Sequence, residues 1–388
     1  MTTPAPVHGD ADEGFGPVVD VFRDNFTARG DVGAAVALYV RGRKVVDLYG
    51  GLADPRSGRR WAADTPAVVF SCTKGILAVC AYLLVQQGRL DLDAPVTRYW
   101  PEFGQHGKDV IPVRWLLTHQ AGLPALDRPL TRADVVAWTP VIEAIEAQPP
   151  LWPPGTAHSY HAMTYGWLVG EVIRRVTGQL PGAFFRAALA DPLGLRTWIG
   201  LPDAERAAVA WMLAPPAGAL PALDPVAERG LTMNGAYAFP ADDEGLVSFN
   251  DPVIQAAGIP GAGAVSTAEG LARLYAAAVS DVDGSGRLLT AASVDDATTP
   301  RVWGQQRYGP PDEGQRWGTG FLLDSPPARP LLGARSFGHD GAGGHVAFGD
   351  DAHEVGFAYV VNQMGGVADE RGDRLVAAVR RCLAGRPA

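Results

Sequence analysis

The sequence predicts an α+β fold, in which an antiparallel sheet flanked by helices is accompanied by a mostly helical lobe. Segments typical of strands lie near both ends of the chain, while residues from about 88 to 249 carry short helical patterns between Pro- and Gly-rich loops. Strands at both ends with helices between them suggest one sheet assembled from the two termini. The strand segments are 34–40, 44–51, 316–324, 336–350 and 354–363.

The chain is long enough for two lobes. Its 388 residues bury a large core, and 47% hydrophobic with 19% charged residues indicate a globular protein. We divide it into a flexible leader (1–14), an α/β lobe built from 15–80 and 250–388, and an inserted, mainly helical lobe (81–249).

The first strand pair is predicted from AAVALYV (34–40) and KVVDLYGG (44–51), which are joined by the hairpin-sized turn Arg41-Gly42-Arg43. A loop follows, and then a helix that begins near Ser71. Its apolar residues recur at the spacing of one helix face: Ile76, Val79, Cys80, Leu83 and Leu84.

In the middle of the chain one helix is clearly patterned. Its apolar stripe consists of Tyr165, Leu168, Val169, Val172, Ile173 and Val176, and Gly178 marks its C-terminal end. The stretch 201–262 has little pattern, and we expect it to pass over the functional site.

The last third is predicted to return to strands after one more helix. Ser266, Thr267 and Glu269 form a predicted capping box that opens this helix. The preceding GIPGAGAV (258–265) resembles a dinucleotide loop but lacks the full glycine spacing, which favours a tight turn. An amphipathic helix (373–384) closes the chain.

Charge and composition exclude several classes of partner. The net charge of −9 argues against nucleic acid and anionic membranes. No signal peptide is visible, and no apolar stretch approaches the roughly 20 residues of a membrane span. The three cysteines show no metal or disulfide spacing. We therefore expect a reduced, cytoplasmic protein, and the sequence gives no indication of its oligomeric state.

Ser71 and Lys74 are the first candidates for catalysis. On a helix that begins near Ser71, Lys74 lies about one turn further on, within reach of the serine hydroxyl. Serine needs a positioned base to act as a nucleophile, and a partly desolvated lysine can lose its proton and serve. The helix N-terminus also offers N–H groups to a developing oxyanion.

Tyr160 is the candidate proton shuttle for the leaving group, because it lies in an irregular turn after Pro-Pro-Gly. Cationic neighbours would lower its pKa toward a useful range. The alternative is a tyrosine that packs a helix start.

The segment Phe337–Gly344 is the second candidate partner, because glycines let a strand edge approach a ligand. A main-chain N–H near Ala342 would complete an oxyanion hole. His339 would form a hydrogen bond with the carbonyl region of the substrate or with Tyr160. The alternative is a glycine-rich hairpin with an incidental histidine.

The remaining histidines and Cys72 carry structural interpretations. His119 is expected to be buried and hydrogen-bonded, whereas His345 and three others look solvent-facing or incidental. His158 and His161 lack a third ligand, so no metal or other cofactor is expected. Cys72 is interpreted as a small buried hydrophobe. No G-x-S-x-G elbow supports an α/β-hydrolase.

The order SCTK (71–74), YHA (160–162) and HDG (339–341) resembles the serine β-lactamase-like superfamily, specifically the class C-like esterases called family VIII carboxylesterases. Further similar segments follow in the expected order from about residue 15 to the C-terminal helix: YWPEF (99–103), LLTHQAGLP (116–124), DPLGL (191–195) and AVSTAEGLARL (264–274).

The resemblance implies a β-lactamase/penicillin-binding-protein-like fold and assigns roles to the candidates. Ser71 would be the acylated nucleophile, Lys74 its proton acceptor, and Tyr160 the general base or shuttle. The segment His339, Asp340 and Gly341 would stand where β-lactamases carry Lys-Thr-Gly. The main-chain N–H groups of Ser71 and Ala342 would form the oxyanion hole.

Two departures favour ester hydrolysis over antibiotic hydrolysis. Ala162 replaces the asparagine of Tyr-x-Asn, and His339 replaces the lysine that meets a substrate carboxylate. We therefore expect a serine carboxylesterase acting on a small-molecule ester. The alternatives are an acyltransferase on a natural-product alcohol or amine, a β-lactamase or amidase, and a non-catalytic binding protein.

Overall fold

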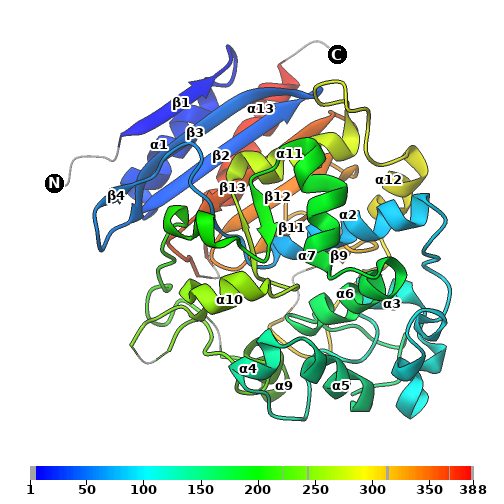
Figure 1. Cartoon of the computed structure of the whole chain (residues 1–388). Helices are drawn as coiled ribbons and strands as arrows, with labels where there is room; N and C mark the ends of the chain where they lie inside the picture. The colour runs from blue at the N-terminus through cyan, green and yellow to red at the C-terminus, as the bar shows by residue number, and fades with distance from the viewer. Residues whose placement is uncertain (1–5, 221, 243, 312–313, 367, 386–388) are drawn as a thin grey trace.

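An antiparallel sheet with strands from both ends of the chain spans the upper part of the molecule (Figure 1). The computed structural model describes residues 6–220, 222–242, 244–311, 314–366 and 368–385. In spatial order the sheet contains β1 (Val7–Ala11), β3 (Arg43–Asp54), β2 (Gly33–Val40), β13 (Val355–Val361), β12 (His345–Asp350), β11 (Ser336–Gly341), β10 (Leu322–Leu323), β9 (Arg316–Trp317) and β8 (Val302–Trp303), with β4 (Arg59–Arg60) paired to β3. The predicted α+β fold class is confirmed.

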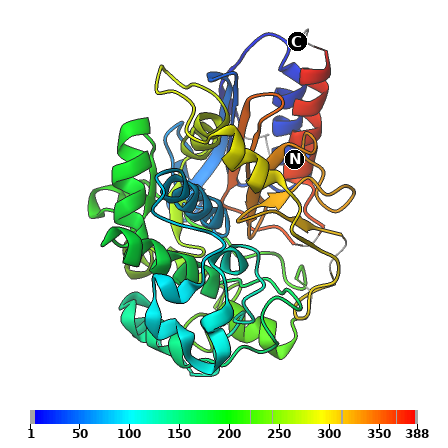
Figure 2. The ribbon, with the colours of Figure 1, turned by 90° about the vertical axis from the view of Figure 1, so that its right-hand side faces the viewer.

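The two ends of the chain meet where β2 pairs with β13, and Ala37 lies opposite Ala358. Both strands are buried on both faces, which explains their nearly continuous apolar sequences. On one face, Val36 and Tyr359 pack beneath α1 (Gly16–Ala28) and α13 (Arg371–Ala384), which lie side by side in Figure 2. On the other face, the alternate residues pack against α11 (Ala268–Val279).

The helix α2 (Cys72–Gln86) contacts the sheet at β11 and contacts α6 (Thr164–Thr177) on its other side. It therefore connects the sheet to the helical part of the molecule, in the lower half of Figure 1. The other helices are α3 (Val113–Leu117), α4 (Arg132–Val136), α5 (Thr139–Ala147), α7 (Pro181–Phe185), α8 (Asp191–Leu193), α9 (Pro225–Thr232), α10 (Pro252–Ala257) and α12 (Ala291–Thr298). Segments of 3₁₀ or π helix occupy Val96–Arg98, Pro101–Val110, Arg186–Ala190, Asp203–Ala208 and Ser248–Asn250.

A small second sheet, β5–β7–β6, lies beside the start of α2. Its strands are β5 (Ala67–Val68), β7 (Ala264–Ser266) and β6 (Thr197–Ile199). Because β5 ends three residues before Ser71 and pairs with β7, this sheet fixes the segment that leads into the predicted nucleophile.

Most predicted elements are present, with three corrections. The leader was predicted to be flexible through residue 14, but Val7–Ala11 pairs with β3 and forms an edge strand; residues 1–5 lie outside the described residues. The helix start is capped by Thr267, whose hydroxyl accepts a hydrogen bond from the N–H of Gly270, rather than by Ser266. The segment 316–324 forms two short strands, because a turn at Gly320 (φ 86°) interrupts it. The lobe boundaries at 80 and 250 remain a prediction.

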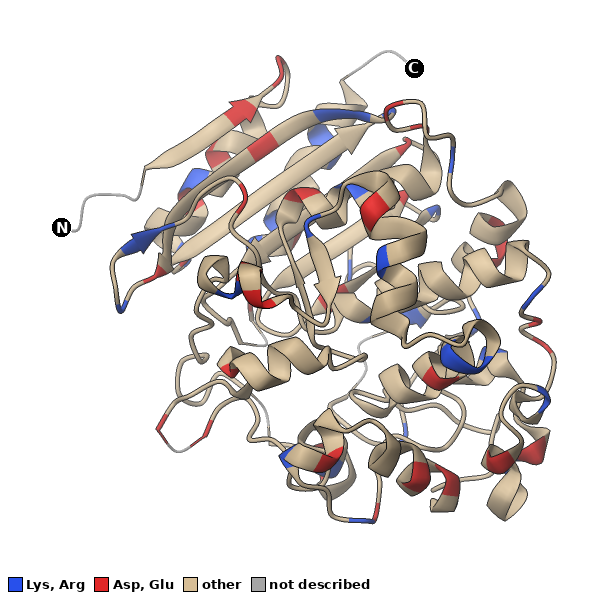
Figure 3. Cartoon of the chain, viewed as in Figure 1, with Lys and Arg blue, Asp and Glu red and all other residues tan. Residues whose placement is uncertain are grey.

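Basic and acidic residues are interspersed in both the sheet and the helical part (Figure 3). None of the helices that the structure describes is both long and apolar enough to cross a membrane. The cytoplasmic location remains a prediction.

Candidate active site

Ser71 lies at the N-terminus of α2, as the sequence predicts. The residue before it, Phe70, has a left-handed backbone (φ 43°), which is strained for a bulky residue and is typical of a functional turn. The hydroxyl of Thr73 holds this turn: it donates to the carbonyl of Phe70 (2.5 Å) and accepts from the N–H of Ala264 on β7 (3.0 Å). The turn that carries Ser71 is therefore held in place by hydrogen bonds to both α2 and β7.

Lys74 is fully buried beside Ser71, one helical turn on. Its Nζ lies 3.0 Å from Ser71 Oγ and donates to the carbonyls of Ala162 (2.7 Å) and Gly261 (2.8 Å). Burial holds the pKa of Lys74 well below its ordinary value of 10.5, because desolvation penalises the charged form. The amine of Lys74 donates one hydrogen bond to each of these two carbonyls. In its neutral form, its lone pair can therefore accept a hydrogen bond from the hydroxyl of Ser71.

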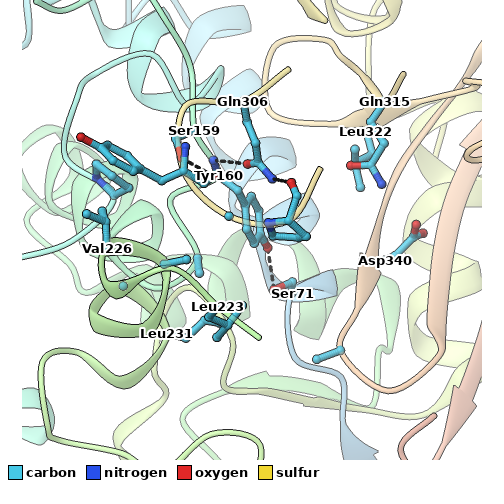
Figure 4. Close-up of a pocket in the computed structure, with 18 of the residues that line it drawn as sticks. Ser71, Ser159, Tyr160, Leu223, Val226, Leu231, Gln306, Gln315, Leu322 and Asp340 are labelled. Atoms are coloured by element: carbon cyan, nitrogen blue, oxygen red, sulfur yellow. Dashed lines mark hydrogen bonds between the residues drawn. The ribbon is translucent and has the colours of Figure 1, made fainter. Parts of the chain in front are cut away.

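Tyr160 approaches the serine from a different segment. Its hydroxyl lies 2.7 Å from Ser71 Oγ, and its main-chain N–H donates to Gln306 Oε1 (3.1 Å), as Figure 4 shows. Its ring stacks on Trp317 with centroids 5.6 Å apart. Burial raises the pKa of Tyr160 well above its ordinary value. The expectation that cationic neighbours lower this pKa is therefore wrong, because desolvation is the largest effect and Lys74 is itself driven toward neutrality.

Ser71 and Tyr160 line a cavity of about 350 Å³. One wall comes from the weakly patterned stretch 201–262, as expected, and Figure 4 shows Leu223, Val226 and Leu231 across from Asp340. No Lys or Arg side chain is among the described residues that line it. Its walls are therefore mainly apolar and carry no fixed cation.

The strand β11 forms the opposite wall and brings Ala342 beside the cavity. A Cβ on Gly341 would lie only 2.3 Å from the carbonyl oxygen of Val69, so glycine is needed for the strand to approach the serine turn. Among the residues that the structure describes, nothing accepts a hydrogen bond from the main-chain N–H of Ser71 or Ala342. Both donors are available for a ligand oxygen.

The two polar side chains of this wall differ in their partners. Asp340 binds Arg329 through two hydrogen bonds (2.6 and 2.7 Å), and Arg329 is almost fully buried. His339 is buried at 2% exposure, and its Nδ1 lies 2.7 Å from the carbonyl of Asp340. Burial holds the pKa of His339 well below 6.5, so the imidazole is neutral.

Among the other histidines, one expectation is confirmed and one is wrong. His119 is buried, and its Nδ1 accepts from the N–H of His161. His345 was expected to be solvent-facing or incidental, but it is fully buried on β12, where its ring packs against the ring of Phe70 with centroids 5.8 Å apart. No group of three or more His, Cys, Asp or Glu in the described part of the chain is arranged to hold a metal ion.

Four residues that the sequence did not single out for this site complete it: Gly261, Gln306, Trp317 and Arg329. The turn 258–265 was predicted as a tight turn without a functional role, and it supplies the carbonyl that binds Lys74. Gly166 of α6 makes room for this turn, since a Cβ on Gly166 would lie 2.1 Å from the main-chain nitrogen of Gly261.

Comparisons with known proteins show which family this chain is similar to. The profile of the beta-lactamase family matches residues 22–381. The esterase/beta-lactamase LipL of Mycobacterium tuberculosis is 36% identical over 372 residues, which cover 92% of this chain and 83% of LipL.

Solved structures are similar over nearly the whole chain. A family VIII carboxylesterase is 33% identical, with a TM-score of 0.87 over 97% of this chain and all of that one. EstA from Arthrobacter nitroguajacolicus Rue61a is 35% identical, with a TM-score of 0.86 over 98% and 99% of the two chains.

Proposed function

Since the chain belongs to the beta-lactamase family and is an esterase-type serine hydrolase of that fold, we propose that it cleaves carboxylic esters through an acyl-enzyme on Ser71. The observation that carries this proposal is the convergence of Lys74 Nζ and the Tyr160 hydroxyl on one serine oxygen, at 3.0 and 2.7 Å. Nucleophilic catalysis by serine requires such neighbours.

The protonation states give each residue a role. The neutral amine of Lys74 takes the serine proton as Oγ attacks the ester carbonyl carbon. The N–H groups of Ser71 and Ala342 stabilise the negative charge that develops on the carbonyl oxygen. Tyr160 is protonated at neutral pH, and burial raises its pKa further; it donates a proton to the departing alkoxide and recovers one from Lys74.

The second half of the reaction reverses these transfers. Water enters the place vacated by the alcohol and gives up a proton through Tyr160 to Lys74, while its oxygen attacks the acyl carbon. Ser71 Oγ then leaves with the proton held by Lys74. The reaction therefore consumes one water, releases one acid and one alcohol, and restores the starting protonation states.

The cavity supports a small uncharged ester as the substrate. Its wall of Leu223, Val226 and Leu231 favours apolar groups, and no Lys or Arg among the described lining residues is placed to pair with a carboxylate. The carboxylate of Asp340 already has a partner in Arg329. We therefore propose ester turnover well above turnover of nitrocefin, a carboxylate-bearing β-lactam.

The test is intact-mass spectrometry after mixing with a short p-nitrophenyl ester. Wild type is expected to gain one acyl mass and to release a burst of p-nitrophenol. Ser71→Ala is expected to do neither. Ser159→Ala is the matched control, because Ser159 also lines the cavity but its hydroxyl donates to the carbonyl of Tyr308 (2.9 Å).

The control is expected to keep the adduct. An adduct that persists in Ser71→Ala refutes the assignment of the nucleophile. Nitrocefin turnover as fast as ester turnover would instead indicate a β-lactamase.

A further inference from the structure

The turn between β11 and β12 carries one of the two proposed oxyanion donors. It consists of Ala342, Gly343 and Gly344, and the N–H of Gly344 donates to the carbonyl of Gly341 (3.3 Å). Gly343 and Gly344 have positive φ angles (89° and 106°), which glycine adopts without steric cost. Because glycine restricts the backbone least, the position of the Ala342 N–H depends on the contacts that hold this turn from outside.

The outside contacts of the turn converge on the carbonyl oxygen of Gly343. Nη2 of Arg371, the first residue of α13, donates to this oxygen (3.1 Å), and so does the N–H of Gly365 (3.1 Å). The same Nη2 donates to the carbonyl of Gln363 (3.0 Å), so Arg371 also holds the segment from which Gly365 donates. Both hydrogen bonds to Gly343 therefore depend on one guanidinium group.

The side chain of Arg371 is itself fixed by two carboxylates. Its Nε and Nη2 donate to Asp369 (2.9 and 2.6 Å), and its Nη1 donates to Asp31 (2.6 Å). Arg371 is buried at 3% exposure, and Asp31 is held in turn by the hydroxyl of Tyr359 on β13 (2.5 Å). The planar guanidinium is pre-organised for several bonds at once, so it is a rigid anchor for the turn.

Arg374 provides an internal comparison on the same helix. It lies one turn further along α13, and its Nη2 pairs with Asp24 of α1 (2.6 Å), with 29% of the arginine side chain exposed. Its anionic partner therefore lies on the neighbouring helix and not at the turn. The two arginines separate the packing of α13 against α1 from the contact between α13 and the turn.

We propose that Arg371 is a positioning residue of the oxyanion hole, whose hydrogen bond to the carbonyl of Gly343 keeps the N–H of Ala342 directed at the acyl carbonyl oxygen. Arg371 is not among the described residues that line the cavity beside Ser71, so it acts through the turn and not on the substrate. This inference rests on the proposed esterase function, and it concerns how the developing negative charge is stabilised, not which residue is the nucleophile.

The experiment uses two inhibitors that differ in whether they can form an oxyanion. Trifluoromethyl n-butyl ketone offers Ser71 a carbonyl carbon: Oγ adds to it, the serine proton passes to Lys74, and the ketone oxygen becomes an oxyanion. In the corresponding alcohol CH–OH replaces the carbonyl, so Oγ cannot add. The ratio of their inhibition constants, measured against hydrolysis of p-nitrophenyl butyrate, reports on the oxyanion hole and is insensitive to a uniform loss of active protein.

Arg371→Lys is compared with Arg374→Lys. The amine of a lysine is a point charge that cannot bind both carboxylates and the turn together. The preference for the ketone over the alcohol is expected to fall about tenfold in Arg371→Lys, since loss of one oxyanion donor typically costs roughly 10²- to 10³-fold and a displaced donor is weakened without being lost. Arg374→Lys is expected to keep the wild-type preference. An unchanged preference in folded Arg371→Lys overturns the proposal.

A second pair of variants decides the question if Arg371→Lys does not fold. Asp369→Asn replaces one acceptor of the guanidinium with an amide N–H₂, which releases Arg371 beside the turn, and its ketone preference is expected to fall as well. Asp31→Asn removes the partner on the opposite side of Arg371, and it is expected to lower the free energy of unfolding while keeping the preference. A preference that instead follows the loss of stability in both variants assigns Arg371 a structural role only and overturns the proposal.

The proposed function fails by a different result. Absence of Ser71-dependent hydrolysis of p-nitrophenyl butyrate by wild type, or inhibition of wild type by the ketone no stronger than by the alcohol, would refute the acyl-enzyme mechanism itself. Normal hydrolysis and strong ketone inhibition in wild type, with no change in Arg371→Lys or Asp369→Asn, would refute only the role of Arg371.

Discussion

Replacing Gly341 with alanine tests whether the close approach of β11 to the serine turn is needed for catalysis. The new Cβ would lie 2.3 Å from the carbonyl oxygen of Val69, whereas ordinary contacts begin at 3.4 Å, so the strand or the turn must move by about 1.1 Å. That movement separates the N–H groups of Ser71 and Ala342. A misplacement of about 1 Å typically costs about 100-fold in rate.

We therefore expect kcat for a short p-nitrophenyl ester to fall by about 100-fold. The free energy of unfolding is expected to fall by about 1–3 kcal/mol, the usual range for an overpacked core site. Stopped-flow or steady-state p-nitrophenol release measures the first quantity, and urea unfolding measures the second.

The matched control is Gly16→Ala, because a Cβ there meets nothing within 4 Å and the residue is exposed at the start of α1. It is expected to leave both quantities unchanged. A folded Gly341→Ala protein whose kcat lies within twofold of wild type would refute the reasoning, since the N–H of Ala342 would then not need its present position.

The other predictions concern the side chains around the serine. Tyr160→Phe removes a hydroxyl 2.7 Å from Ser71 Oγ, and we expect kcat to fall by about 10²- to 10⁴-fold with little change in thermal unfolding; near-normal turnover would exclude Tyr160 as the proton shuttle. Burial favours the neutral amine of Lys74, so activity should persist at neutral pH, far below the ordinary lysine pKa of 10.5, and should be lost only as the pH falls through the lowered pKa of Lys74. A pH–rate profile in which activity appears only as the pH rises to about 10.5 would contradict this. Below pH 10.5 the Lys74 side chain is protonated in the unfolded state but neutral in the folded one, so the free energy of unfolding of wild type, relative to that of Lys74→Met, should rise as the pH increases toward 10.5. A difference that urea titrations find independent of pH would show that Lys74 is charged in the folded protein. Asp340→Asn leaves the buried guanidinium of Arg329 without its anionic partner, so we expect a loss of about 3–5 kcal/mol by urea unfolding; a loss below 1 kcal/mol would mean that the pair is solvated.

The sequence was sufficient to predict the local elements whose patterns are set by neighbouring residues. The hairpin of β2 and β3, the helix that begins after Ser71 and the helix that ends at Gly178 all follow from periodicity and turn chemistry. The spacing of Ser71 and Lys74 on one helix likewise placed two side chains within hydrogen-bonding distance. These relations span only a few residues, so chain geometry alone determines them.

Other features depend on contacts between distant segments. Edge strand β1 was missed because its pairing with β3 depends on a partner more than 30 residues away rather than on its own pattern. The pKa of Tyr160 was expected to move in the wrong direction, since burial by Trp317 and other residues from elsewhere in the chain is not visible in the residues around it.

The sequence by itself determined the fold class, the serine helix and the identity of the residues expected to react. Only the tertiary structure decided whether these side chains are charged or neutral and which of their hydrogen-bonding atoms have a partner within the protein. The carbonyls of Ala162 and Gly261 orient the amine of Lys74, and the carbonyl of Asp340 fixes the tautomer of His339. Desolvation and hydrogen bonding at a buried site depend on every atom around it, and those atoms come together only when the chain is folded.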